Sequence, residues 1–151
     1  MIKILFVCHG NICRSPMAEF VFKDMVRKQG LSDEFEIASA ATSNEEIGND
    51  IHCGTRQKLI SEGIPFSPRK ARRITQNDFL YFDYIICMDS NNLRNLPEAE
   101  RRQFKNKIYR LLDFCEFPRD IKDPWYTGNF DEPYRDISEG CEKLLIKLAD
   151  I

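Results

Sequence analysis

The sequence lacks a long apolar run, a strong excess of charge of either sign and an internal repeat. No stretch approaches the roughly 20 apolar residues that cross a bilayer, so we expect no membrane partner. The opening residues, MIKILFVC, hold only a short apolar run without a small-residue cleavage site, which argues against a secretory signal. A formal net charge of −2 gives no general reason to expect a nucleic-acid partner.

The cysteines do not form the pattern of a disulfide-stabilised secreted domain. There are six of them at irregular intervals in 151 residues, a length that can bury a core of its own. Cys87 and Cys141 lie inside apolar segments, where a reduced and buried thiol is expected. No linker or low-complexity tract divides the chain. We therefore predict a single domain, residues 1–151, in the reducing environment of the cytoplasm.

Strand-like and helix-like segments alternate along the chain. Strands are predicted at 2–8, 35–40 and 84–88, and helices from 15 to about 30, over 55–64 and over 132–151. Ser15 and Pro16 are expected to serve as the N-cap and the first residue of the first helix. Residues 107–114 fit either a strand or the beginning of a helix. The alternation is typical of a parallel α/β sheet flanked by helices.

A turn rich in reactive side chains, CHGNICRS at 8–15, follows the first predicted strand. In an open parallel sheet, ligands bind beyond the carboxyl ends of the strands. The N–H groups of the loop and the following helix N-terminus can converge there on an anion. Arg14 can grip a tetrahedral oxyanion through paired hydrogen bonds, and the same field favours the thiolate of Cys8. The pattern predicts a phosphate-binding loop with Cys8 as its nucleophile.

Cys8 and Cys13 also fit three interpretations other than a nucleophile and its neighbour. A zinc site from Cys8, His9 and Cys13 would lack the second paired half that such sites carry. A structural Cys8–Cys13 disulfide is not expected in a reducing compartment. A reversible disulfide between the same two residues stays open, because it would act as a redox switch on a working nucleophile. His9 itself is expected to be a loop position that faces the rim.

Asp123 is the candidate for the proton transfers that such a nucleophile needs. The proline after Asp123 favours an extended backbone, on a loop that can lean over a neighbouring site. As a general acid it would protonate the departing oxygen, and as a general base it would then activate water. Trp125 and Tyr126, beside it, would provide aromatic walls suited to an aromatic phosphoester.

Five segments, in order, resemble the low-molecular-weight protein tyrosine phosphatase family. They are VCHGNICRSPMAE near the start, SAATS at 39–43, ARRIT at 71–75, FDYIICMDSNNLRNL at 82–96 and DPWYTGNF at 123–130. The resemblance covers essentially the whole chain. It implies a single-domain, three-layer α/β fold with a four-stranded parallel sheet flanked by helices, and no metal or cofactor. The implied activity is hydrolysis of phosphotyrosine in tyrosine-phosphorylated proteins, with inorganic phosphate or vanadate as inhibitors.

The resemblance also implies roles for individual residues. Cys8 would form a phosphocysteine intermediate, Arg14 would bind phosphate and stabilise the transition state, and Asp123 would be the general acid. The other loop positions, which would bind phosphate or shape the loop, are His9, Gly10, Asn11, Ile12, Cys13 and Ser15. Ser39 matches a supporting serine, and Cys13 matches the partner cysteine of an oxidative disulfide. Trp125 and Tyr126 match the aromatic pair beside the acid.

Two positions depart from the family pattern. Glu45 stands where the family often has an aromatic wall of the substrate pocket, so we expect a less apolar pocket with altered preference for flanking sequence or phosphorylated group. Arg69 stands where the family often has a histidine in the network around the loop asparagine. We therefore expect the support of Asn11 to be built differently.

Three alternative functions share parts of this pattern. Arginine phosphatases resemble CxGNTCRS and tend to have a smaller pair after the Asp-Pro, whereas Ile12 with Trp125 and Tyr126 favours phosphotyrosine. Thiol-dependent arsenate reductases need further cysteines on a mobile segment, but Cys87 lies in an apolar strand. A phosphate-binding module without turnover would not need Cys8 and Asp123 as well as an arginine.

Overall fold

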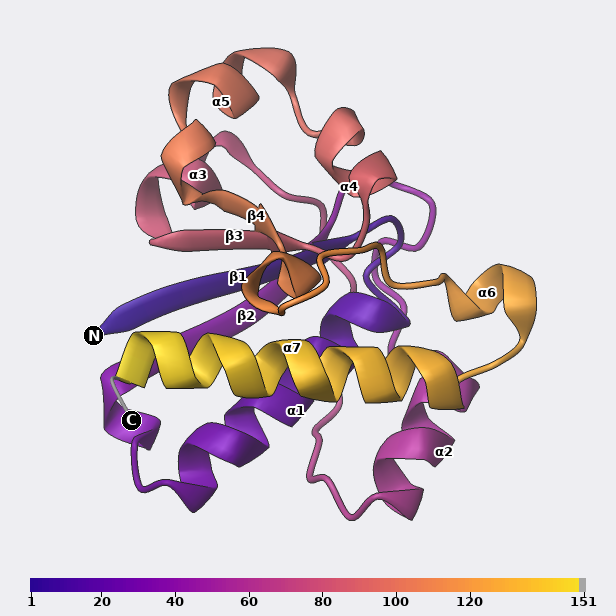
Figure 1. Ribbon diagram of the computed structural model, residues 1–151. Helices are drawn as coiled ribbons and strands as arrows, with labels where there is room; N and C mark the ends of the chain where they lie inside the picture. The colour runs from indigo at the N-terminus through magenta and orange to yellow at the C-terminus, as the bar shows by residue number, and fades with distance from the viewer. Residues whose placement is uncertain (150–151) are drawn as a thin grey trace.

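The computed structural model describes residues 1–149 as a four-stranded parallel sheet between two layers of helices (Figure 1). The strand order is β2-β1-β3-β4, with every pair parallel. The strands are β1 (Ile2–Cys8), β2 (Phe35–Ala41), β3 (Tyr84–Cys87) and β4 (Ile108–Arg110). This arrangement confirms the predicted fold class, and it brings the carboxyl end of β1 between its two neighbours.

The helices cover both faces of the sheet. The long helices α1 (Arg14–Lys28) and α7 (Asp131–Ala149) pack on one face, with α2 (Cys53–Ser61) beside α1 (Figure 1). The opposite face carries three short helices, α3 (Gln76–Tyr81), α4 (Ser90–Asn95) and α5 (Glu98–Gln103). One further turn, α6 (Pro124–Thr127), lies at the carboxyl edge of the sheet. Short 3-10 turns occupy Ser32–Glu34, Lys105–Lys107 and Leu111–Phe114.

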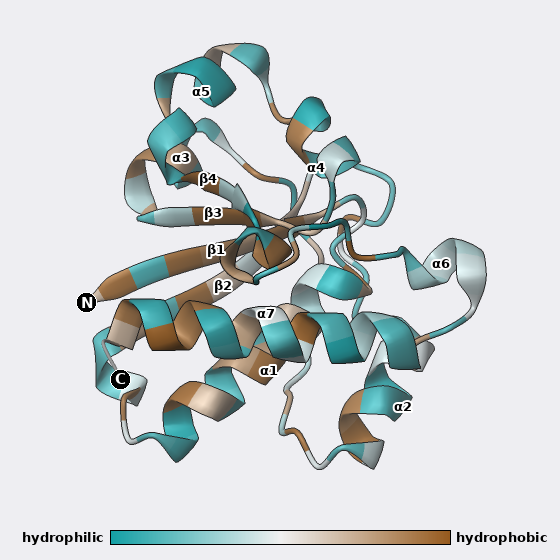
Figure 2. Ribbon diagram, viewed as in Figure 1, coloured by the Kyte–Doolittle hydropathy of each residue, from teal (hydrophilic) through white to brown (hydrophobic). Residues whose placement is uncertain are grey.

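The first strand is apolar on both faces because both faces are buried. Phe6 packs in the cluster under α1 and α7, whereas Leu5 and Val7 belong to the cluster that includes Phe79 of α3. Figure 2 shows hydrophobic and hydrophilic segments alternating along α1 and α7. A central parallel strand with helices on each side is expected to be continuously hydrophobic, as β1 is from Ile4 to Cys8. The core therefore fixes the position at which β1 ends.

Most predicted elements match the structure within one or two residues. Residues 107–114 contain both of the structures considered, because β4 runs directly into a 3-10 turn. The C-terminal helix begins at Asp131, and the last two residues of its predicted range lie outside the described residues. Within residues 1–149, no helix combines the length and apolar character needed to cross a membrane.

The predicted start of the first helix is wrong in one respect. Arg14, not Pro16, is the first helical residue, and Cys13 occupies the N-cap position without a side-chain capping bond. The hydroxyl of Ser15 instead lies 3.0 Å from Cys8 Sγ. Ser15 therefore serves the loop rather than the helix end. Its N–H, in the first turn of α1, donates to Cys8 Sγ, and the N-cap residue makes no side-chain capping bond.

Candidate active site

The sulfur of Cys8 lies in a ring of hydrogen-bond donors at the carboxyl end of β1. The backbone N–H groups of Asn11 and Ser15 donate to Cys8 Sγ at 3.3 and 3.4 Å, and the Ser15 hydroxyl lies 3.0 Å away. These groups come from a single loop that curls around the sulfur before entering α1. Such a concave set of N–H groups, at a helix N-terminus, stabilises negative charge on the sulfur and on any anion bound beside it.

Asn11 holds this loop in shape. Among the described residues it is the one non-glycine with a positive φ, 59°. Its Nδ2 donates to Ser15 Oγ at 2.8 Å and to Ser39 Oγ at 2.9 Å, and the Ser39 hydroxyl donates to Glu19 Oε1 at 2.6 Å. The predicted supporting serine is therefore in contact with the loop asparagine, and Glu19 extends the chain of hydrogen bonds into α1.

Arg14 is buried within this site, with only 2% of its surface exposed. Its Nη1 donates to Asp89 Oδ2 at 2.6 Å and to the carbonyl of Ile121 at 2.7 Å. Its Nη2 makes only a long contact of 3.5 Å with Asp123 Oδ2. Burial by itself would lower the pKa of Arg14, but the negative charges of Cys8, Asp89 and Asp123 outweigh it and raise the pKa. The guanidinium is thus a fixed positive charge.

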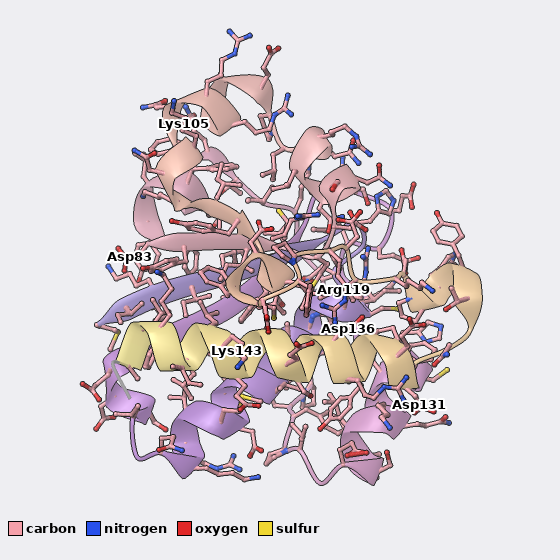
Figure 3. The ribbon with its side chains drawn as sticks, viewed as in Figure 1. Asp83, Lys105, Arg119, Asp131, Asp136 and Lys143 are labelled. Carbon is pink, nitrogen blue, oxygen red and sulfur yellow. The ribbon has the colours of Figure 1, made fainter. Side chains whose placement is uncertain are left out.

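The segment that carries Ile121 and Asp123 is tied to the rest of the fold by ion pairs. Arg119 donates to Asp136 at 2.8 Å and to Glu139 at 3.0 Å, both on α7 (Figure 3). At the end of the segment, Asp123 is the N-cap of α6, and its Oδ1 accepts from the N–H of Trp125 at 3.0 Å. These contacts hold the carboxylate of Asp123 at the edge of the site.

A cavity opens over the loop, with about 480 Å³ of empty space that includes its open mouth. Its most buried lining residues are Cys8 and Arg14, whereas Trp125 and Tyr126 are 57% and 81% exposed. The remaining lining residues are His9, Gly10, Ile12, Cys13, Glu45, Glu46 and Asp123. The shape is that of a narrow pocket with a cysteine sulfur and a guanidinium on its floor and aromatic rings at its rim.

The structure brings the predicted site residues together in two shells. Cys8, Arg14, Asp123 and the pocket residues line the cavity. The side chains of Asn11, Ser15 and Ser39 do not line it and are joined by hydrogen bonds from Asn11 Nδ2. His9 lies at the rim, where its Nε2 is 2.9 Å from Glu45 Oε2.

The remaining cysteines do not extend this chemistry. All six are free, and the described residues contain no group of three or more His, Cys, Asp and Glu side chains that could hold a metal ion. Cys87 and Cys141 are completely buried, and burial raises the pKa of both thiols. Cys87 lies inside β3, so it cannot act as a mobile relay cysteine for arsenate reduction.

Sequence reasoning missed several groups that complete the site. Asp89, the main partner of Arg14, follows the carboxyl end of β3, and the rule that placed the loop could have found it. Glu46 stands next to Glu45 and lines the same cavity. The carbonyl of Ile121 could not have been found, because a backbone acceptor has no sequence signature.

Comparison with known proteins gives a consistent result. The profile described as "Low molecular weight phosphotyrosine protein phosphatase" matches residues 3–150. The low molecular weight protein-tyrosine-phosphatase YfkJ of Bacillus subtilis is 45% identical over 150 residues, which cover 98% of this chain and 96% of that protein. A crystal structure of YfkJ superposes with a TM-score of 0.95 at 44% identity, covering 99% of this chain and 96% of that one.

Two further relatives bear on the substrate. The human low molecular weight phosphotyrosine protein phosphatase is 41% identical over 151 residues, covering 96% of this chain and 94% of the human protein. A Drosophila protein described as an arginine phosphatase has a TM-score of 0.87 at 32% identity, with 97% of each chain covered. The same fold thus occurs in proteins named for two different phosphorylated side chains.

Proposed function

This chain belongs to the low molecular weight phosphotyrosine protein phosphatase family, and we propose that residues 1–151 form one domain that hydrolyses phosphotyrosine in protein substrates. The proposal rests on the hydrogen-bond donors that surround Cys8 Sγ. Two backbone N–H groups and the Ser15 hydroxyl lie within 3.4 Å of the sulfur, on the floor of a cavity shared with Arg14 and Asp123. One pocket therefore holds a nucleophile (Cys8), an anion-binding group (Arg14) and a proton donor (Asp123).

In the first step, the Cys8 thiolate attacks phosphorus while the bond between phosphorus and the tyrosine oxygen breaks. Arg14 and the loop N–H groups bind the phosphoryl oxygens, where negative charge must be stabilised. The contact between Arg14 Nη2 and Asp123 Oδ2 is long, at 3.5 Å, and therefore weak. The incoming phosphate replaces Asp123 as the partner of this nitrogen. The carboxyl of Asp123, released from that contact, donates its proton to the leaving tyrosine oxygen.

In the second step, water hydrolyses the phosphocysteine. The carboxylate of Asp123 takes a proton from water, the water oxygen bonds to phosphorus, and the sulfur–phosphorus bond breaks to restore the Cys8 thiolate. The same residue thus serves first as acid and then as base. Asp123 occupies the edge of the cavity, on the side open to water, with 23% of its side chain exposed.

The pocket walls favour a flat aromatic substrate but carry an acidic side that many such pockets lack. Trp125 and Tyr126 supply aromatic surface, while Glu45 and Glu46 line the same cavity. We expect kcat/KM for a phosphotyrosine peptide to exceed that for matched phosphoserine and phosphoarginine peptides. Glu45→Tyr should raise the phosphotyrosine value by about two- to tenfold, since an aromatic contact contributes on the order of 0.5–1.5 kcal/mol.

Glu45→Gln serves as the matched control, because it removes the charge and adds no ring. Steady-state kinetics on the three peptides with both variants and the unmodified chain separate charge from shape. A higher kcat/KM of the unmodified chain for the phosphoarginine peptide than for the phosphotyrosine peptide would contradict the proposal. If Glu45→Gln and Glu45→Tyr change kcat/KM for the phosphotyrosine peptide equally, the change is caused by the loss of charge alone.

Cys13 is proposed as the redox partner of Cys8. Both cysteines line the cavity, and Cys13 is buried. Burial first, then the negative charges of Cys8 and Asp123, raise the pKa of Cys13 to about 12, so it stays a thiol at neutral pH. Peroxide would therefore oxidise Cys8 to a sulfenic acid, releasing hydroxide. Condensation with the Cys13 thiol would then form the disulfide and release water. Such a switch suits the reducing cytoplasm, where we propose that the protein acts.

A Cys13→Ala variant tests this role. After a short exposure to peroxide and then to a dithiol reductant, the unmodified chain should regain most of its activity. The variant should not, because its Cys8 proceeds to the irreversible sulfinic acid. Recovery of the variant to the same extent would rule out protection by Cys13. Cys53→Ala is the control, since Cys53 is exposed and does not line the cavity.

A further inference from the structure

Arg69 contacts the phosphate-binding loop at Asn11, the loop residue with a left-handed backbone, although the two are 58 positions apart in the sequence. Asn11 has a φ of 59°, in the left-handed region that most residues with a Cβ atom avoid and that asparagine adopts with the help of hydrogen bonds. Such a conformation persists only where surrounding contacts hold it. The contacts that hold Asn11 are therefore part of what shapes the site.

Arg69 makes the largest share of those contacts from behind the loop. One guanidinium nitrogen, Nη2, donates to the backbone carbonyl of Asn11 at 2.6 Å and also to the side-chain oxygen of Asn11. The backbone N–H of Arg72 donates to the same side-chain oxygen at 3.2 Å. Main chain and side chain of Asn11 are thus held at once by one charged group.

This arrangement bears directly on the nucleophile. The N–H of Asn11 is one of the two backbone donors to Cys8 Sγ. Rotation of Asn11 out of its left-handed conformation would turn that N–H away from the sulfur. Arg69 also brings a positive charge close enough to interact with Cys8. Burial lowers the pKa of Arg69, and the charges of Glu19, Asp50 and Cys8 oppose that effect. The guanidinium remains charged, because an arginine does not lose its proton in a protein.

The same side chain reaches the segment that forms the acidic wall of the pocket. Arg69 Nη1 donates to the carbonyl of Asn49 at 3.3 Å, and Ala71 N–H donates to that carbonyl at 2.7 Å. The Gly48 N–H donates in turn to the carbonyl of Ala71 at 2.9 Å. Residues 45–49 carry Glu45 and Glu46. Arg69 therefore connects the pocket wall to the loop that holds the nucleophile.

We propose that Arg69 is a positioning residue that keeps Asn11 in its left-handed conformation and supplies a fixed positive charge behind the Cys8 thiolate. The inference rests on the proposed function, in which Cys8 is the nucleophile. Arg69 does not contact substrate; it acts through Asn11 and through charge. These two contributions can be separated, because lysine keeps the charge but has a single nitrogen, so it cannot bond Asn11 and the carbonyl of Asn49 through two nitrogens held in one plane.

The experiment compares Arg69→Met and Arg69→Lys with Lys70→Met, an exposed neighbour whose loss changes net charge equally. Two quantities are measured: kcat/KM for p-nitrophenyl phosphate, and the pH dependence of Cys8 alkylation by iodoacetamide, followed by mass spectrometry. Arg69→Met should lower kcat/KM by about tenfold or more, the size expected for a lost hydrogen bond to a charged group. It should also move the midpoint of Cys8 alkylation to higher pH. Arg69→Lys should shift the midpoint less, and Lys70→Met should change neither quantity.

Cys53, the exposed thiol, is the reference in the same alkylation samples. In combination with Asn11→Ala, the loss caused by Arg69→Met should be clearly less than in the unmodified chain, because both changes disturb one contact. An unshifted alkylation profile in Arg69→Met, or full additivity with Asn11→Ala, would overturn the inference. If Arg69→Met does not fold, Arg69→Lys is tested by the same two measurements. Values of kcat/KM and of the alkylation midpoint equal to those of Lys70→Met would then contradict the inference. Absence of turnover in the unmodified chain with a shifted alkylation profile would refute the proposed function alone.

Discussion

Cys8→Ser should abolish turnover of aryl phosphates and leave the anion site intact. The serine hydroxyl is a much weaker nucleophile than a thiolate, so we expect kcat to fall on the order of 10⁴-fold or more. The loop should keep its shape, because the contacts of Asn11 with Ser15, Ser39 and Arg69 do not involve the sulfur. Isothermal titration with inorganic phosphate should therefore still detect binding in the variant.

Arg14→Met is the counterpart that separates chemistry from binding. It keeps the nucleophile and removes the guanidinium, so phosphate and vanadate should inhibit it far less than the unmodified chain. Cys53→Ser, at an exposed cysteine outside the cavity, should retain full activity. Residual turnover in Cys8→Ser equal to that of the unmodified chain would exclude a phosphocysteine intermediate on Cys8. Loss of phosphate binding in Cys8→Ser would show that the sulfur itself holds the anion.

The contents of the loop were predictable from sequence because they are local. Cys8, Asn11 and Arg14 lie within one strand–turn–helix unit, and the topology of a parallel sheet dictates that this turn faces a ligand site. The preference of serine for helix N-caps nevertheless misled the prediction for Ser15. The loop uses that hydroxyl beside Cys8 Sγ and leaves the helix end without a side-chain cap. At Ser15, the contact with Cys8 Sγ therefore outweighs the preference of serine for the N-cap position.

The groups that hold the loop from a distance were less accessible. Asp89 could have been expected, since β3 is adjacent to β1 and its carboxyl end lies at the same edge. Arg69 was recognisable only as a departure at a position in an irregular loop, and its contacts with both oxygens of Asn11 depend on how residues 49–72 fold back. Periodicity and turn signals do not encode such a path. Long-range packing of loops therefore sets the limit of what could be predicted.

Asp123→Ala should affect substrates according to how much their leaving group needs a proton. For phenyl phosphate, which has a poor leaving group, kcat/KM should fall by about 10²–10⁴-fold, the usual range for loss of a general acid. For p-nitrophenyl phosphate, whose leaving oxygen is stable as an anion, kcat/KM should change by only a few-fold. The parameter kcat/KM reports the steps up to formation of the phosphocysteine, so it isolates the acid role from the later base role.

The base role makes a second prediction for the same variant. Without Asp123 to accept a proton from water, hydrolysis of the phosphocysteine should become slower than its formation from p-nitrophenyl phosphate. Rapid mixing should then show a burst of p-nitrophenolate equal to the enzyme concentration, followed by slow turnover. Asp131→Ala, which removes an exposed carboxylate at the start of α7, is the matched control and should behave like the unmodified chain (Figure 3). Equal losses of kcat/KM for both substrates would contradict the acid role, and a missing burst would contradict the base role.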